Sequence, residues 1–323
     1  MNTWNLENLY KGLETDAFSK DNHQFDTLLD DLKAKANACL KEINSQNAEA
    51  FLKTLTQAKI LELKLGNFLF LSLAVDSTNK DFNNALVRLQ KKSLKFTLPI
   101  TLFRKSIKQC NHLEDLISQS SYLKEHRFFL NEIRQKSIHL LSDNEEMMAA
   151  ELGQSGGGLL EKMHSNLTAT LEVDYQGKLI PLSSVRNLAY SNDAATRLAA
   201  YHAELKSYER INKPLSFALN GIKKEVITLS KKRNYPNVLS QTLQENRMDK
   251  ETLDALLEAM HDALPKFREY LKRKASLLRH KEGLPFYDLF APIGNTSNKT
   301  YSIDDAQNFI LKNFETFSSD LSN

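Results

Sequence analysis

The most metal-like spacing in this sequence joins Glu258 and His261, which lie three positions apart in a segment with helical periodicity. Side chains at positions i and i+3 project from one side of a helix, as they do in bundles that bind two metal ions. A pair of this kind is more often part of a solvated polar face. We therefore predict a polar helix surface here, with a di-metal bundle as the less favoured alternative.

A zinc hydrolase needs two imidazoles one helical turn apart and a carboxylate that acts as general base on metal-bound water. None of the eight histidines begins the His-Glu-x-x-His motif that supplies these groups. Ser183 and Ser184 lack a Gly-x-Ser-x-Gly turn, and Cys39 and Cys110 have no recognisable His partner. We therefore expect no catalytic residue, no metal ligand and no cofactor in this chain.

The glycine cluster at residues 154–158 reads QSGGG. Glycines before a helix can hold a phosphate through backbone N–H groups. Phosphate loops of that type follow a strand and continue into Gly-Lys-Ser or Gly-Lys-Thr, and neither feature is present. We predict a flexible connector or a helix break at this point.

The elements that carry these residues are predicted to be helical, with one clear exception. From Leu167 to Tyr175 apolar and polar residues alternate, which is typical of a half-buried strand. Gln176-Gly177 suits a tight turn, and a second short strand ends at Pro181. The sequence predicts an antiparallel hairpin at about residues 168–182 and a short extended, aromatic-rich segment near residues 286–292.

Apolar residues recur at helical spacing along most of the remaining chain, with short polar breaks between the segments. The fold class is therefore predicted to be mainly α, a multi-helix bundle or stacked helices. The longest expected helical segments lie at about residues 23–43, 48–75, 102–117, 122–141, 193–211, 249–280 and 302–317. Further helices are expected to open at Asn79 or Asp81, at the capping box of residues 142–145 and after Ser183 or Ser184, and one more to end at about Arg233.

Composition narrows the class of protein. Hydrophobic residues make up 41% and charged residues 26%, as in globular chains. Forty-three basic and 40 acidic residues leave a charge of +3, which does not favour nucleic-acid binding. No apolar run is long enough to span a bilayer, and no secretion signal is recognisable. Because two distant cysteines suggest buried free thiols, we expect a cytoplasmic protein without membrane contact.

Three runs of sequence resemble the oligoendopeptidase F family, zinc metallopeptidases of the thimet type. They read TATLEVDYQGKLIPLSSVRNLAYSNDAATRLAAY from Thr168, LNGIKKEVITLSKKRNY from Leu219 and FYDLFAPIG from Phe286. The resemblance covers the whole chain and is most specific between Leu167 and Gly294. It implies a mainly helical fold around a cleft, oligopeptide substrates, and zinc held by His-Glu-x-x-His and a Glu on a following helix.

The resemblance also implies a domain organisation. Residues 1–190 correspond to a helical N-terminal domain ending in the hairpin, and residues 191–323 to the first part of a helical catalytic domain. The family's zinc helix lies beyond residue 323, so zinc belongs to the full-length parent protein. Candidates for contact with a peptide substrate, each of which packing explains at least as well, are Arg186, Asn187, Tyr190, Tyr201 and Tyr208.

The final predicted helix carries an apolar face of Phe309, Ile310, Phe314 and Phe317, and no typical stop signal follows it. We expect the chain to be truncated and this helix to be uncovered, so that copies of the chain self-associate through it. The alternative interpretation is a free-standing helical scaffold that binds a peptide or protein partner.

Overall fold

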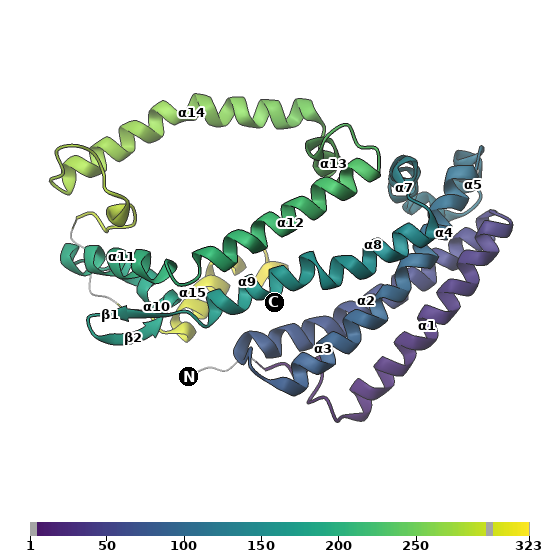
Figure 1. Ribbon diagram of the computed structural model, residues 1–323, viewed down its shortest axis with the longest axis horizontal. Coiled ribbons are helices and arrows are strands. Elements are labelled where there is room, and N and C mark those ends of the chain that lie inside the picture. The colour runs from purple at the N-terminus through teal and green to yellow at the C-terminus, as the bar shows by residue number, and fades with distance from the viewer. Residues whose placement is uncertain (1–4, 295–299, 323) are drawn as a thin grey trace. The chain divides into compact units, whose positions relative to one another are not determined.

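The computed structural model describes residues 5–294 and 300–322 (Figure 1). These residues are mainly helical and contain one two-stranded antiparallel sheet, which confirms the predicted fold class. They fall into two compact units: a larger unit of residues 6–171 and 208–257, and a smaller unit of the other described residues. No helix in the described ranges is both long and apolar enough to cross a membrane.

The larger unit begins with long helices whose first turns are capped by side chains. The Thr15 hydroxyl accepts a hydrogen bond from the Phe18 amide, and the Asn44 side chain accepts one from the Asn47 amide. The helices of the first half of this unit are α1 (Asp16–Lys41), α2 (Ser45–Val75), α3 (Lys80–Ser93), α4 (Thr97–Gln109), α5 (Leu113–Ser118), α6 (Ser121–Glu125) and α7 (Arg127–Lys136), with 3-10 turns η1 (Leu94–Phe96) and η2 (Ser137–His139).

The core of the larger unit lies where α1 packs against α2 and α4 (Figure 1). Phe25 of α1 and Phe51 of α2 are fully buried, and the Phe51 ring stacks on Phe103 of α4 at 4.1 Å between centroids. Burying such side chains removes a large apolar area from water, which is the main favourable term in folding. This core holds α1, α2 and α4 together.

The larger unit continues with α8 (Asp143–Ser155), α9 (Gly157–Ala169), α12 (Asn212–Lys232) and α13 (Val238–Glu245). The glycine cluster separates α8 from α9, so the predicted helix break is confirmed. A carboxylate of the protein lies at the N-terminus of α9: the Gly157 amide donates to Glu225 Oε2 of α12 at 2.7 Å. A helix N-terminus attracts negative charge, and here an internal side chain supplies it.

The smaller unit contains the predicted hairpin, formed by β1 (Glu172–Tyr175) and β2 (Lys178–Pro181) with Val173 opposite Ile180. Gly177 has φ +80° in the turn, as the Gln-Gly pair predicted. The strand starts later than the alternation indicated, because residues 168 and 169 belong to α9. The Thr168 hydroxyl bonds the His164 carbonyl at 2.9 Å, so threonine completes the last helical turn there.

After the hairpin the smaller unit is mainly helical. The segment near residues 286–292, expected to be extended, begins with the 3-10 turn η4 (Phe286–Asp288), in which the Asp288 amide donates to the Pro285 carbonyl. This turn directs Asp288 into the interior. The other elements are α10 (Leu182–Asn187), η3 (Leu188–Tyr190), α11 (Ala194–Tyr208), most of α14 (Lys250–Leu277), α15 (Ile303–Glu315) and α16 (Ser319–Ser322).

Candidate functional site

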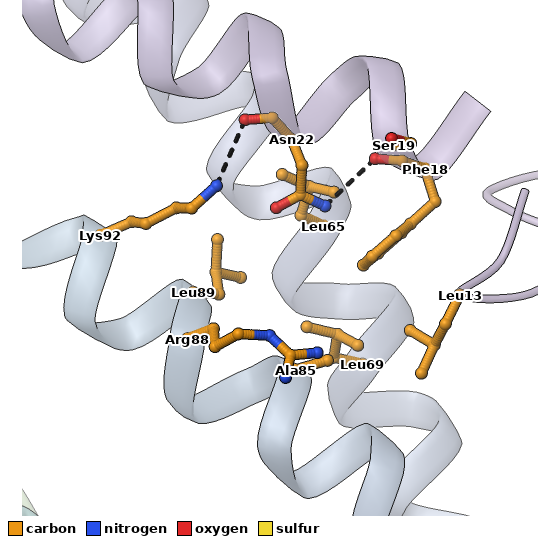
Figure 2. Close-up of a pocket in the computed structure, with 10 residues that line it drawn as sticks. All are labelled: Leu13, Phe18, Ser19, Asn22, Leu65, Leu69, Ala85, Arg88, Leu89 and Lys92. Carbon is orange, nitrogen blue, oxygen red and sulfur yellow. Dashed lines mark hydrogen bonds between the residues drawn. The ribbon is translucent and has the colours of Figure 1, made fainter. Parts of the chain in front are cut away.

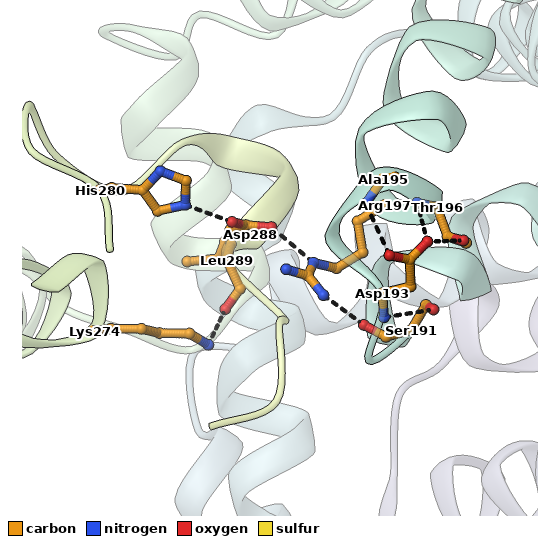
Figure 3. Close-up of polar contacts among 9 residues, drawn as sticks. All are labelled: Ser191, Asp193, Ala195, Thr196, Arg197, Lys274, His280, Asp288 and Leu289. Carbon is orange, nitrogen blue, oxygen red and sulfur yellow. Dashed lines mark hydrogen bonds and ion pairs between the residues drawn. The ribbon is translucent and has the colours of Figure 1, made fainter. Parts of the chain in front are cut away.

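A buried ion pair joins two distant parts of the smaller unit. Arg197 of α11 and Asp288 of η4 are 4% and 2% exposed, and Arg197 Nε donates to Asp288 Oδ1 at 2.7 Å (Figure 3). The same guanidinium donates through Nη1 to the Ser191 carbonyl at 2.7 Å. A buried charge is tolerated when it is paired and hydrogen-bonded, and both conditions hold here.

Lys274 in the last turn of α14 and His280, three residues after the end of that helix, complete this cluster. His280 Nε2 donates to Asp288 Oδ2 at 2.6 Å, and the buried Lys274 ammonium donates to the Leu289 carbonyl at 2.7 Å (Figure 3). Asp288 therefore has one donor on each carboxylate oxygen. We call Arg197, Lys274, His280 and Asp288 the Asp288 cluster.

The Asp288 cluster suits a structural anchor better than an acid–base catalyst. Burial by itself raises the pKa of the Asp288 carboxyl, but hydrogen bonds from Arg197 and His280 and the positive charge of Arg197 outweigh it, so the pKa lies below its ordinary value. The carboxylate is ionised at neutral pH, and both of its oxygens are engaged. A general base needs a free oxygen close to the proton that it removes.

Aromatic side chains surround the segment that this cluster anchors. Tyr190 lies against Phe290 at 5.1 Å between ring centroids, and Tyr201 lies 6.1 Å from Phe286 and 5.8 Å from Tyr287. Tyr190, Phe286 and Phe290 are 61%, 70% and 50% exposed. We call Tyr190, Tyr201, Phe286, Tyr287 and Phe290 the aromatic surface. Exposed aromatic groups on a fixed backbone offer large contact area at a low entropic cost, which favours ligand binding.

The five predicted substrate-contact residues occupy different positions. Tyr190 and Tyr201 both contact the segment at residues 286–290, so the structure brings them to one surface. Arg186 and Asn187 are exposed on α10, where Arg186 Nε donates to Glu204 at 2.9 Å. Tyr208 is half-buried and is assigned to the larger unit. Their role in substrate contact stays a prediction.

The Glu-x-x-His pairs of the sequence gain no third metal ligand among the described residues. Glu258 and His261 are exposed on α14, and a second Glu-x-x-His pair that sequence reasoning overlooked, Glu161 and His164, is exposed on α9. Within residues 5–294 and 300–322, no three His, Cys, Asp or Glu side chains are placed to hold one metal ion. The described residues therefore do not fit a tightly held zinc ion, which needs at least three protein ligands.

Both cysteines are buried and free, as predicted. Burial raises the pKa of Cys39 to about 12, so its thiol is protonated at neutral pH. Because the thiolate is the nucleophilic form, Cys39 is an inert core residue.

Long-range polar contacts in the larger unit involve the run LNGIKKEVITLSKKRNY. Arg233 binds Glu146 of α8 through both terminal nitrogens, at 2.8 and 2.7 Å, while Tyr235 stacks on His139 at 3.7 Å between centroids. With Glu225 at the glycine cluster, this run fastens α12 to α8 and α9. The other two runs meet through Arg197 and Asp288. All three therefore carry contacts that hold distant segments together.

Sequence reasoning missed every member of the Asp288 cluster. One signal was available: Asp288 is the single charged residue in FYDLFAPIG, and a lone charge among aromatic and apolar residues indicates a buried, paired carboxylate. Its partners gave no such signal, because Arg197 lies in an ordinary amphipathic helix and Lys274 is one of three consecutive basic residues, Lys272, Arg273 and Lys274. Only the tertiary structure shows which cations reach Asp288.

Comparison with known proteins gives consistent results. The family model for oligopeptidase F matches residues 111–172, and that for peptidase family M3 matches residues 187–317. An oligoendopeptidase F homolog of Mycoplasma pneumoniae is 23% identical over 321 residues, covering 96% of this chain and 51% of that protein. Oligopeptidase PepF of Bacillus subtilis is 24% identical over 206 residues, covering 62% of this chain and 31% of that protein.

The fold of this chain is also similar to that of a solved oligoendopeptidase. The crystal structure of oligoendopeptidase-F from Enterococcus faecium superposes with a TM-score of 0.70 at 18% identity, covering 91% of this chain and 63% of the other. The chain thus spans about half or less of the length of the related sequences above. The two family models lie in order along the chain and together cover more than half of it, so this chain belongs to the oligoendopeptidase F group of peptidase family M3.

Proposed function

We propose that residues 1–323 form the N-terminal part of a zinc metalloendopeptidase that hydrolyses oligopeptides. The observation that carries the proposal is the pair of family matches in order along the chain, since both belong to one peptidase family. Residues 1–190 would form the helical N-terminal domain, and residues 191–323 the first part of the catalytic domain. The free cysteines suit a cytoplasmic location.

Zinc in this proposal belongs to the parent protein. When bound, zinc acidifies a water molecule and polarises the peptide carbonyl. The sequence has no His-Glu-x-x-His, and the described residues offer no set of three ligands. The ligands would therefore come from residues outside this chain, and the chain alone would not cleave peptides.

The part that this chain plays would be to bind and orient the peptide. The aromatic surface offers apolar contacts for substrate side chains. Arg186 and Asn187 lie on α10, and their side chains carry polar groups suited to a peptide backbone. The Asp288 cluster would act indirectly, by holding the segment at residues 286–290 in place. A peptide held in a fixed position reacts faster because less entropy is lost at the transition state.

The test measures zinc and peptide cleavage together. Residues 1–323 are dialysed and analysed for zinc, and a quenched fluorescent peptide is added with and without a separately produced remainder of the same protein. We expect no bound zinc and no cleavage alone, and chelator-sensitive cleavage after mixing. Stoichiometric zinc with chelator-sensitive turnover by residues 1–323 alone would overturn the proposal.

Variants of the aromatic surface then locate the substrate in the mixed enzyme. Tyr190→Ala should raise KM several-fold, because it removes a contact made equally in the ground and transition states. Phe70→Ala is the matched control, since Phe70 is a similarly exposed aromatic residue, 65% on α2, that belongs to the larger unit and not to the aromatic surface. Equal KM values for the two variants would remove Tyr190 from the substrate site.

The second candidate function is a free-standing helical scaffold that binds a peptide or protein partner. The observation that favours it is the exposed apolar face of α15, where Phe309 and Phe314 are 70% and 47% exposed. The coding DNA after residue 323 separates the two candidates. An in-frame His-Glu-x-x-His there supports the peptidase, and a stop codon directly after Asn323 supports the scaffold.

A further inference from the structure

A small pocket opens between α1, α2 and α3 in the larger unit (Figure 2). Its volume is about 260 Å³, which is below the range of sites for drug-sized ligands and suits a group the size of one amino acid. Its floor is apolar and mostly buried, formed by Leu65, Leu69, Ala85 and Leu89. This floor would take one apolar side chain.

A single uncompensated positive charge lies at the pocket. Figure 2 shows the Arg88 guanidinium beside Leu69 and Ala85, and no hydrogen bond or ion pair to Arg88 is found among the described residues. The neighbouring Lys92 differs, because its ammonium binds Asp26 Oδ2 at 2.7 Å and is neutralised there. Arg88 is therefore the cation available to a ligand, and a guanidinium pairs best with a carboxylate through two parallel hydrogen bonds.

The opposite wall of the pocket offers a hydrogen-bond acceptor. The Asn22 side-chain nitrogen donates to the Phe18 carbonyl at 3.1 Å, which leaves the carboxamide oxygen on the side of the pocket (Figure 2). A ligand that satisfies both walls carries a carboxylate for Arg88, an N–H donor for Asn22, and an apolar side chain for the floor between them. The C-terminal residue of a peptide has all three groups.

We propose that this pocket binds the C-terminal residue of a short peptide whose last side chain is apolar. A phosphate or a bare anion leaves the apolar floor uncovered, and a fatty acid gives Asn22 no donor. The site lies wholly within the larger unit and is formed by three packed helices, so it requires neither zinc nor peptide cleavage. The inference is therefore independent of the proposed peptidase activity and can fail or succeed separately.

The test is a titration of residues 1–323 followed by backbone amide chemical shifts, with N-acetyl-leucine as the probe. Shifts should concentrate on α1, α2 and α3. N-acetyl-leucinamide, which lacks the charge, and N-acetylglycine, which lacks the apolar side chain, should each bind about tenfold more weakly. The compound 4-methylpentanoate keeps the carboxylate and the apolar chain but lacks the amide N–H, and should bind about threefold more weakly.

Two matched variants test the charge. Arg88→Gln should weaken N-acetyl-leucine binding about tenfold and leave N-acetyl-leucinamide binding unchanged, because only the charged ligand uses the guanidinium. Lys91→Gln removes the same charge from an exposed neighbouring position on α3 that does not line the pocket, and should change neither affinity. Both positions are exposed, so the variants should fold normally.

Several results would overturn the proposal. They are the absence of saturable shifts with N-acetyl-leucine, shifts that map outside the three helices, equal binding of the acid and its amide, and equal effects of Arg88→Gln and Lys91→Gln. Binding of 4-methylpentanoate as tightly as N-acetyl-leucine would identify a general carboxylic-acid site instead and would also contradict the peptide assignment.

Discussion

Arg197 and Asp288 are 91 residues apart in the sequence, yet Arg197 Nε and Asp288 Oδ1 lie 2.7 Å apart in the interior of the smaller unit. This pair ties α11 to the segment that carries Phe286 and Phe290. The geometry of the aromatic surface therefore depends on a contact that none of its aromatic residues makes.

Removing the charge of Asp288 should destabilise the smaller unit strongly. Asp288→Asn leaves the buried Arg197 without its counter-charge, and breaking a buried pair in this way costs about 3–5 kcal/mol. The free energy of unfolding, measured by urea denaturation, checks this. Asp254→Asn is the matched control, since it removes one partner of an exposed pair on α14 and should cost less than about 1 kcal/mol. Similar losses in the two variants would contradict the role of the cluster.

The stability of the smaller unit should fall in acid. Because the pKa of Asp288 is lower in the folded state than its ordinary 3.8, the unfolded chain binds more protons as the pH falls. The contribution of Asp288 is complete well above pH 3.8 and is lost as the pH falls through 3.8 towards the folded-state value. Denaturation between about pH 6 and about pH 3 should show a shallower loss for Asp288→Asn than for the wild type. Parallel curves would refute this.

The glycine cluster should not tolerate a side chain. A Cβ at Gly156 would lie 2.8 Å from both Glu225 Oε2 and the Leu152 carbonyl oxygen, and the second contact is with backbone that cannot rotate away. We expect Gly156→Ala to lower the free energy of unfolding by about 1–3 kcal/mol. Gly12→Ala is the control, because a Cβ there meets nothing within 4 Å, and it should stay within about 0.5 kcal/mol of the wild type. Equal stability of both variants would show that α8 and α9 adjust freely.

The inward face of the hairpin should matter and the outward face should not. Leu171 and Val173 are 6% and 0% exposed, so truncating either to Ala should cost about 2–4 kcal/mol. Leu179, which is 62% exposed on β2, provides the comparison, and Leu179→Ala should cost less than about 0.5 kcal/mol. Chemical denaturation of the three variants measures the difference. A loss below about 0.5 kcal/mol for Val173→Ala would mean that this face is assigned wrongly.

The exposed face of α15 should drive self-association of residues 1–323. Its side chains Phe309, Ile310 and Phe314 are 70%, 50% and 47% exposed, and apolar faces of this kind are covered in stable proteins. In sedimentation velocity experiments, the sedimentation coefficient should rise with protein concentration. The double variant Phe309→Ser, Phe314→Ser should abolish the rise, whereas Phe70→Ser on α2 should retain it. A wild-type coefficient that is independent of concentration would count against this interface.

The sequence by itself determined most of the helical regions and where the hairpin lies, because these depend on local periodicity and turn chemistry. It did not show that the predicted helices at residues 102–117 and 122–141 are each divided into shorter helices. Alternation from Leu171 to Tyr175 and the Gln176-Gly177 turn specify the strands locally. The first residues of the predicted strand became helix because threonine at position 168 satisfies a helical carbonyl as readily as a strand position. Such ends depend on neighbouring turns that a short pattern does not include.

The tertiary structure alone decided which charged residues are paired. The pairing of Asp288 with Arg197 and His280, and of Glu225 with the Gly157 amide, depends on how helices far apart in sequence pack. Arg88 and Lys92 look alike in the sequence, four positions apart on one helix, yet only Lys92 reaches a carboxylate. A charge carries no local mark of its partner, because ion pairs form through space, and packing decides which groups come within reach.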